Sequence, residues 1–336
     1  MISIRTVLRP FAAVGLLLLG AGCADYTDRD DVQAYMAEVS EEHDFTPEEL
    51  EQLFSQATRQ SSILEAIARP AERTLKWHEY REIFLQEPRV EQGLQFWNDN
   101  EEALQAAWAA FGVPPEYEVA IIGVETRYGQ ITGGYRVLDA LTTLTFDYPP
   151  RAPFFRKELT QFLLLAREEG RDPLELKGSY AGAMGYGQFI PSSFRSYAVD
   201  FDEDGTRDIW SNTWDAIGSV ANYFASHGWQ PEAEVVRAVT VVSAAADGVA
   251  NQSLELNHTI DDLRTLGVEV DGFDSFDGAE AVALFRMKLA DGAEYWLGLN
   301  NFYVITRYNR SRLYALAVHQ LAQAIRARRE VLTAGS

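Results

Sequence analysis

Apolar residues recur at helical spacing along most of this chain. Thr46 to Glu49 forms a capping box with proline at the first helical position, and Leu50, Leu53 and Phe54 then follow along one helix face. Similar spacing, ended by glycine or proline, recurs in later segments. The pattern predicts a mainly helical protein, with helices over residues 61–67, 75–84, 90–97, 101–111, 155–169, 217–227 and 311–329.

The pattern changes after Pro231. Residues 235–242, 281–289 and 293–297 are rich in β-branched, aromatic and alternating positions, with Gly and Asp turns between them. We therefore expect a small β domain over residues 234–297, inserted before the last helices.

The first 22 residues have the features of an export signal. Arg5 and Arg9 precede an apolar stretch over residues 11–19, which is too short to span a bilayer as a mature helix. Cys23 follows small residues and is the single cysteine, so no intrachain disulfide can form. We expect cleavage before an acylated Cys23, although an ordinary signal that ends in cysteine is the alternative. Residues 23–31, with four acids and no aliphatic side chain after Ala24, are expected to form a polar tether.

The net charge of the chain disfavours some classes of binding partner. The formal net charge is −21, so nucleic acid and anionic membrane surfaces repel the chain and phosphate-binding functions are disfavoured. The chain has seven tryptophans and fifteen tyrosines, which suit carbohydrate faces as well as protein cores. The five histidines show no metal-binding spacing, and no organic cofactor motif is present.

Two segments carry the candidate chemistry. Glu125 directly follows the apolar run 119–124, where desolvation disfavours a charged carboxylate and favours an acid that can donate a proton. Residues 178–193 combine glycines with Tyr180, Tyr186, Gln188 and serines, which is the composition of a groove wall for a sugar. An acid beside such a groove indicates cleavage of a glycosidic bond.

These segments also resemble a known family. The resemblance covers residues 32–328 and rests on six motifs in order: 77–80, 121–129, 178–193, 208–210, 215–224 and 301–309. The chain resembles the lytic transglycosylases of the membrane-bound lytic murein transglycosylase B type. This resemblance implies a mainly α, α+β protein with a helical N-terminal domain over 32–115 and a lysozyme-like catalytic core over 116–233. The C-terminal helices of residues 298–336 would pack with both the N-terminal domain and the catalytic core and complete their folds.

The resemblance also implies a mechanism with one acid. Glu125 matches the catalytic acid of the family, which protonates the oxygen leaving C1 of N-acetylmuramic acid and then accepts the proton of its C6 hydroxyl. The product would be a 1,6-anhydro ring. Asp139 and Asp147, the nearby acids in sequence, are expected to cap or turn the chain. The alternatives are a hydrolysing muramidase and a non-catalytic lipoprotein that binds peptidoglycan and scaffolds cell-wall synthases as partners.

Residues of the substrate groove follow from the same resemblance. Arg151 matches a position near the peptide stem of the substrate. Ser179 and Gln188 have little packing value in a glycine-rich turn, whereas Tyr223 and Tyr314 alone would more often be core residues. The positions that match sugar subsites are Tyr80, Ser179, Gln188, Tyr223, Tyr308, Asn309 and Tyr314.

A third motif predicts a metal site. Residues 200–206 open like an EF-hand loop, with acids at positions one, three and five before a glycine, but position twelve is Ser211 rather than glutamate. The family resemblance implies a longer loop, 200–215, that binds a structural Ca²⁺. Its expected ligands are the side chains of Asp200, Asp202, Asp204 and Asp215 and the backbone of Thr206.

The residue after Cys23 predicts the destination of the chain. Ala24 rather than aspartate in this position implies, by the sorting rule of Gram-negative bacteria, the outer membrane. We expect a lipoprotein on its periplasmic face, with peptidoglycan glycan strands as the binding partner.

Overall fold

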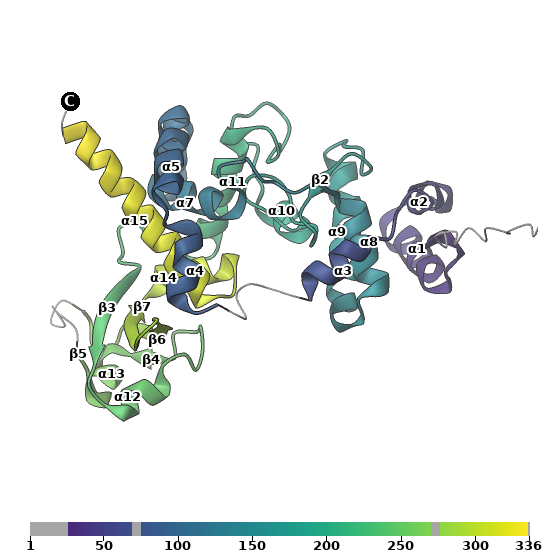
Figure 1. The fold of residues 1–336 in the computed structure, drawn as a ribbon. Helices are drawn as coiled ribbons and strands as arrows, with labels where there is room; N and C mark the ends of the chain where they lie inside the picture. The colour runs from purple at the N-terminus through teal and green to yellow at the C-terminus, as the bar shows by residue number, and fades with distance from the viewer. Residues whose placement is uncertain (1–25, 69–74, 270–275, 335–336) are drawn as a thin grey trace, which may run out of the picture.

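The computed structural model describes residues 26–68, 75–269 and 276–334 (Figure 1). The described part is mostly helical, and one small sheet projects from one end of an elongated array of helices. The helices are α1 (Asp30–His43), α2 (Pro47–Phe54), α3 (Ser61–Ile67), α4 (Trp77–Phe84), α5 (Glu87–Asp99), α6 (Glu101–Phe111), α7 (Pro115–Thr126), α8 (Val137–Asp147), α9 (Ala152–Glu168), α10 (Pro191–Tyr197), α11 (Thr213–Ser226), α12 (Ala244–Val249), α13 (Ile260–Leu266), α14 (Asn300–Tyr308) and α15 (Arg312–Ala334).

Local sequence signals determine several of these helix ends. At the start of α2, Thr46 accepts from the amide of Glu49 while the Glu49 carboxylate accepts from the amide of Thr46, so the predicted capping box is confirmed. Gly112 follows α6 with φ +70, the left-handed conformation common after a helix. Pro115 then opens α7.

The expected tether is wrong from Tyr26 onward, because these residues pack on the helices. Residues Tyr26–Asp28 form a 3-10 helix. Tyr26 is buried, and its hydroxyl donates a hydrogen bond of 2.7 Å to the Asp147 carboxylate. Arg29 forms an ion pair with Asp147 at 2.7 Å. These partners lie more than a hundred residues away in sequence, which is why local composition indicated a solvated segment. The signal segment and Cys23 lie outside the described residues, and none of the helices described has the length and apolar character needed to cross a membrane.

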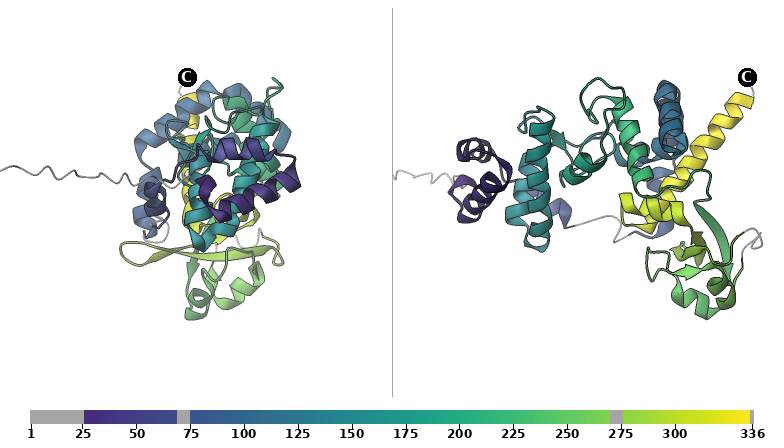
Figure 2. Two further views of the ribbon diagram at one scale, coloured as in Figure 1. Left: turned by 90° about the vertical axis from the view of Figure 1, so that its right-hand side faces the viewer. Right: turned by 180° about the vertical axis from the view of Figure 1, so that it is seen from behind.

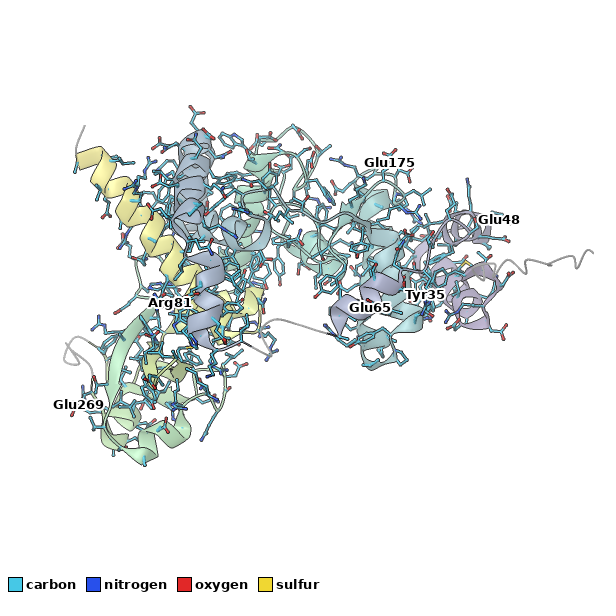
Figure 3. All side chains as sticks on the ribbon, viewed as in Figure 1. Tyr35, Glu48, Glu65, Arg81, Glu175 and Glu269 are labelled. Carbon is cyan, nitrogen blue, oxygen red and sulfur yellow. The ribbon has the colours of Figure 1, made fainter. Side chains whose placement is uncertain are left out.

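Residues 32–115 divide between two groups of helices, which differs from the single domain expected. The helices α1, α2 and α3 lie beside α8 and α9, whereas α4, α5 and α6 pack against α7, α11 and α15 (Figures 1 and 2). Tyr35 of α1, labelled in Figure 3, shares a hydrogen bond of 3.0 Å with Thr160 of α9. The helices of the first group therefore support the α8–α9 side of the core.

The predicted small sheet is present, with two short helices that the sequence pattern did not reveal. Five antiparallel strands run in the order β4-β6-β7-β3-β5 and, with α12 and α13, enclose a small apolar core of their own. The strands are β3 (Val236–Val241), β4 (His258–Thr259), β5 (Val268–Glu269), β6 (Ala281–Lys288) and β7 (Ala293–Gly298). A separate pair, β1 (Tyr135–Arg136) and β2 (Lys177–Gly178), lies beside α8.

The chain enters and leaves the inserted sheet at one place. Val236, where β3 begins, pairs with Gly298, where β7 ends, and the amide of Leu299 donates to the carbonyl of Val235 at 3.1 Å. A second connection comes from α4, where the indole of the fully buried Trp77 donates to the Glu294 carboxylate at 2.7 Å. The indole of Trp296 donates to the same carboxylate oxygen at 2.9 Å. Glu294 thus links the sheet to the helical body.

Candidate active site

Helix α7 positions Glu125 at its exposed end. Almost every other residue of this helix is buried, as its apolar sequence predicts, while Glu125 is partly exposed on the last turn. The helix stops because Arg127 and Tyr128 adopt left-handed backbone conformations, with φ of 53° and 59°. The carboxylate therefore sits where a buried helix reaches a surface.

Three side chains fix this helix end. Arg89 donates to the carbonyl of Gly123 at 2.6 Å, and its own carbonyl accepts from the Tyr128 hydroxyl at 2.8 Å. Thr126 donates to the carbonyl of Tyr186 at 2.9 Å and so ties the helix to the glycine-rich segment. A Cβ on Gly123 would lie 2.6 Å from the Tyr128 hydroxyl, so this close approach requires glycine. The result is a rigid base for Glu125.

A tyrosine holds the Glu125 carboxylate. The hydroxyl of Tyr314, from the first turn of α15, lies 2.5 Å from Glu125 Oε1. Burial, and then the neighbouring Glu125, raise the pKa of Tyr314 well above its ordinary value. The phenol therefore stays protonated at neutral pH. When Glu125 is ionised, Tyr314 can donate this hydrogen bond to it.

Tyr308 and Tyr80 complete an aromatic enclosure around this pair. Burial, followed by the proximity of Glu125, raises the pKa of Tyr308, whose hydroxyl donates to the carbonyl of Gly187 at 2.5 Å. Tyr80 of α4 is buried and packs on Phe84 with ring centroids 5.3 Å apart. Its phenol is close enough to Tyr314 to contribute to the raised pKa of that residue. The structure brings these predicted residues together from α4, α14 and α15.

Tyr223 lies one layer further from Glu125. Its hydroxyl donates to the carbonyl of Arg307 at 2.6 Å, and its ring stacks on His227 at 4.1 Å between centroids. It meets the edge of Tyr308 at 4.8 Å. Burial raises the pKa of Tyr223 to about 12. Tyr223 therefore supports Tyr308, and the structure places its hydroxyl on the backbone.

The glycine-rich segment is held by its own polar side chains. Ser179 accepts from the amides of Ala181 and Ala183, at 3.3 and 3.1 Å. Gln188, at a positive φ of 51°, donates its amide group to the carbonyls of Thr132 and Gly185, both at 3.0 Å. Both side chains therefore hold the backbone of the glycine-rich segment in place.

A groove of about 790 Å³ runs next to this site. Arg151, Tyr180 and Asn309 line it, and so does Leu313, the residue before Tyr314. Glu125 is not among the lining residues, so this volume adjoins the Glu125 carboxylate rather than enclosing it. The remaining lining residues are Ile67, Leu75, Lys76, Trp77, Tyr148, Ala181, Leu254, Arg286, Lys288, Arg310, Ser311 and Arg312.

The other acids near Glu125 in sequence have structural partners. Asp139 forms an ion pair with Arg136 at 2.8 Å and accepts from the amide of Thr58. Asp147 holds Tyr26 and Arg29, as described above, so both acids have structural partners, but Asp147 acts through residues distant in sequence and not as the local cap or turn that was expected. Glu118, on the same helix as Glu125, is fully buried, and burial raises its pKa well above the ordinary value. A substrate cannot reach it.

The residues that fix the end of α7 were missed at the sequence level. Thr126 and Tyr128 lie inside the motif 121–129, but nothing in the sequence indicated that they hold the end of the helix. Arg89 lies in a different helix and gives no sequence signal. Its contact with Gly123 depends on the packing of α5 against α7.

The acidic loop brings three of the predicted metal ligands together. Carboxylate oxygens of Asp200, Asp202 and Asp204 lie within 4.8 Å of one another. The amides of Asp204 and Gly205 donate to the two oxygens of Asp200, at 3.0 and 2.8 Å. Three oxygen donors on a tight turn fit the chemistry of Ca²⁺.

Asp215 and Thr206 occupy different places in this loop. Asp215 is fully buried and accepts from the amides of Phe201 and Asp208, both at 2.7 Å. It therefore closes the loop by hydrogen bonds to backbone amides and lies outside the three-carboxylate cluster. The hydroxyl of Thr206 donates to Asp204 at 2.7 Å.

Comparisons with known proteins agree with this architecture. The family model described as the transglycosylase SLT domain matches residues 27–323. Membrane-bound lytic murein transglycosylase B of Escherichia coli (strain K12) is 43% identical over 310 residues, which cover 90% of this chain and 84% of that protein.

Solved structures extend the comparison. Catenated lytic transglycosylase SltB1 from Pseudomonas aeruginosa is 50% identical with a TM-score of 0.87, covering 91% of this chain and 100% of that one. The Escherichia coli lytic transglycosylase Slt35 in complex with calcium is 43% identical with a TM-score of 0.81, covering 91% and 95%. The chain therefore belongs to the membrane-bound lytic murein transglycosylase B family, whose members are lysozyme-like lytic transglycosylases.

Proposed function

We propose that this enzyme cleaves the β-1,4 bond between N-acetylmuramic acid and N-acetylglucosamine in peptidoglycan, with Glu125 as both acid and base. The hydrogen bond between Tyr314 and Glu125 Oε1 is the observation that carries this proposal. It singles out one accessible carboxylate, while Asp139, Asp147 and Glu118 are engaged elsewhere or buried. An ordinary glycosidase requires a second catalytic carboxylate.

The reaction then proceeds by transfer within the substrate. Protonated Glu125 gives its proton to the bridging oxygen, and the bond between this oxygen and C1 of N-acetylmuramic acid breaks. The C6 hydroxyl of the same sugar attacks C1, and its proton passes to the Glu125 carboxylate. The products are a free 4-hydroxyl on N-acetylglucosamine and a 1,6-anhydro end. Glu125 regains its proton and no water is consumed.

The surrounding residues have supporting roles in this proposal. Tyr314 orients the carboxylate and stabilises it when it becomes anionic. Arg151 and Asn309 contact substrate from the adjoining groove, which they line. The walls of the sugar subsites are assigned to Tyr80, Ser179, Gln188 and Tyr308, whereas Tyr223, also expected in the groove, supports Tyr308 from behind.

The product ends distinguish this mechanism from hydrolysis. Purified sacculi digested in ¹⁸O-water should release muropeptides with unlabelled anhydro ends, because a positioned hydroxyl reaches an effective concentration of about 10⁵ M or more. Mass spectrometry checks the label and the mass, which should be one water lower than that of the hydrolysed product. Labelled, borohydride-reducible muramic acid as the main product would identify a hydrolysing muramidase. No soluble product at all would favour the non-catalytic scaffold.

The three-carboxylate loop is proposed to bind a structural Ca²⁺ through Asp200, Asp202 and Asp204, with the backbone of Thr206. The supporting observations are the clustered oxygens and the solved relative in complex with calcium. Bound Ca²⁺ would neutralise these acids beside the start of α11, the helix that carries Tyr223. Asp215 then acts by closing the loop, with both oxygens on backbone amides.

Calcium is expected to raise the melting temperature of chelator-treated protein. A ligand specific for the folded state contributes about 2.7 kcal/mol at one hundred times its dissociation constant. The double substitution Asp200→Ala and Asp204→Ala should abolish this rise, whereas Glu203→Gln on the same turn should keep it, because Glu203 is outside the cluster. Differential scanning calorimetry with and without millimolar calcium measures the effect. Identical wild-type curves would mean that the loop is only a turn.

Localisation is proposed from the sequence. Cys23 would carry the lipid that anchors the chain to the periplasmic face of the outer membrane, and the Escherichia coli relative is named as membrane-bound. Association with cell-wall synthases remains a prediction of the scaffold alternative.

A further inference from the structure

Helix α9 buries a carboxylate that the proposed mechanism does not use. Glu158 is 5% exposed, and no cation within the described chain forms an ion pair with it. Burial raises the pKa of this carboxyl group, an effect that the hydrogen bonds from Ser192 partly offset. A buried carboxylate without a counter-charge is unfavourable unless hydrogen bonds satisfy its oxygens. The groups that donate to Glu158 therefore indicate its role.

Both oxygens of Glu158 accept from one residue. The amide of Ser192 donates to Oε2 at 2.9 Å, and the hydroxyl of Ser192 donates to Oε1 at 2.8 Å. Hydrogen bonds to an ionised group are roughly twice as strong as bonds between neutral groups. Ser192 lies at the start of α10, which packs against both α9 and α11 (Figure 1). The carboxylate therefore attaches the start of α10 to α9.

The start of α10 is also the end of the glycine-rich segment. Two residues separate Ser192 from Phe189, and one of them is Pro191. Phe189 pairs with Met184 through two backbone hydrogen bonds, of 2.9 and 3.0 Å, which close the turn 184–189. Because proline has a fixed φ, the link between Ser192 and this turn has little conformational freedom. The place of Ser192 therefore determines the place of the turn.

This turn supports the end of α7 and one tyrosine of the site. The carbonyl of Tyr186 accepts from the hydroxyl of Thr126, the residue after Glu125, at 2.9 Å. The carbonyl of Gly187 accepts from the hydroxyl of Tyr308 at 2.5 Å. Both contacts use the backbone of the turn, so a shift of the turn would move both supports together.

We propose that Glu158 is a positioning residue for the cleavage reaction, because through Ser192 it fixes the turn that supports Glu125. The proposal rests on the acid and base role of Glu125. A general acid must lie within hydrogen-bond reach of the oxygen that it protonates. A misplacement of about 1 Å, caused by a change far from the chemistry, can cost about 10²-fold in rate. Glu158 thus acts on the rate through the backbone and does not contact substrate itself.

The test measures kcat and KM per folded molecule on isolated glycan strands. Glu158→Ala should lower kcat about tenfold, within the cost of misplacement, and change KM less. Glu158→Gln should keep most of the activity, because its amide oxygen can accept from the Ser192 amide while its NH2 group donates to the Ser192 hydroxyl. Ser192→Ala keeps the amide bond and should lose less than Glu158→Ala. The double variant should lose no more than Glu158→Ala alone, since the two side chains act as a unit.

Tyr35→Phe is the matched control on the same helix. It removes the hydrogen bond of 3.0 Å between Tyr35 and Thr160 of α9, which lies outside the chain of contacts through Ser192. This variant should lose stability and keep the kcat and KM of wild type. Hydrogen exchange of the turn 184–189, followed by mass spectrometry, gives a second readout. Exchange should be faster in Glu158→Ala and unchanged in Tyr35→Phe.

The outcomes separate this role from the proposed function. A loss of kcat below about threefold in Glu158→Ala, well short of the cost of misplacement, would overturn the positioning role and leave the cleavage reaction intact. An equal loss in Tyr35→Phe would assign the effect to the stability of α9 and also overturn it. Should Glu158→Ala fail to fold, a wild-type kcat in Ser192→Ala would overturn the role. A wild type that releases no product would instead overturn the proposed function.

Discussion

Glu125→Gln is expected to lower the turnover of purified sacculi by about 10² to 10⁴-fold, the range that general acid–base catalysis contributes. Glutamine keeps the size of the side chain, and its amide oxygen can still accept from Tyr314. It cannot give a proton to the bridging oxygen or take one from the C6 hydroxyl. The loss should therefore appear in kcat, measured by release of soluble muropeptides.

Binding should survive this substitution. Pelleting of the variant with sacculi separates a chemical defect from a folding defect, and Glu102→Gln, an exposed carboxylate on α6, provides the control for the same change. Turnover within about threefold of wild type, well below the catalytic range, would remove Glu125 from the catalytic role. The reaction would then need a proton donor from elsewhere in the site.

Trp77→Ala should produce the largest loss of stability, about 3–5 kcal/mol in the free energy of unfolding. The ring is fully buried between α4 and the inserted sheet, so alanine leaves a cavity, and the hydrogen bond to Glu294 is lost. Urea unfolding followed by circular dichroism measures the change. Trp77→Phe, which keeps most of the volume but not the indole N–H, should cost less.

Trp108 provides a matched comparison. It is 48% exposed on α6, so Trp108→Ala should lower the free energy of unfolding by much less than Trp77→Ala does. Equal losses at Trp77 and Trp108 would contradict the assignment of Trp77 as the contact between α4 and the sheet.

Local signals made most helices predictable. The capping box at Thr46 and the proline that opens α2 act within a few residues, and α3 and α6 have the bounds that the pattern indicated. The strands β3, β6 and β7 followed from alternation in the same way. The helices α12 and α13 were missed because they lie inside residues 234–297, where alternating positions indicated strands.

Contacts between distant residues were not predictable. Nothing near Tyr26 and Arg29 in the sequence indicates that Asp147 binds both side chains. The segment was therefore predicted to be a tether, although it packs on the helices. Asp215 matched a ligand position in sequence, but only the structure shows its oxygens on the amides of Phe201 and Asp208. The candidate site depends on the same kind of information. The motif 121–129 indicated Glu125 and the family resemblance indicated Tyr314, and packing of α15 on α7 brings the two together.

The point where the chain enters and leaves the inserted sheet has a consequence for the engineering of this enzyme. The chain leaves the helical body at Val235 and returns at Leu299, and these two residues are hydrogen-bonded to each other. A segment whose ends already touch can be exchanged without changing the path of the chain on either side, provided that the replacement keeps its contacts with the helical body. Those contacts are the hydrogen bond between Trp77 and Glu294 and the buried face of β6 formed by Ala283, Phe285 and Met287, so an exchange between relatives would have to conserve both.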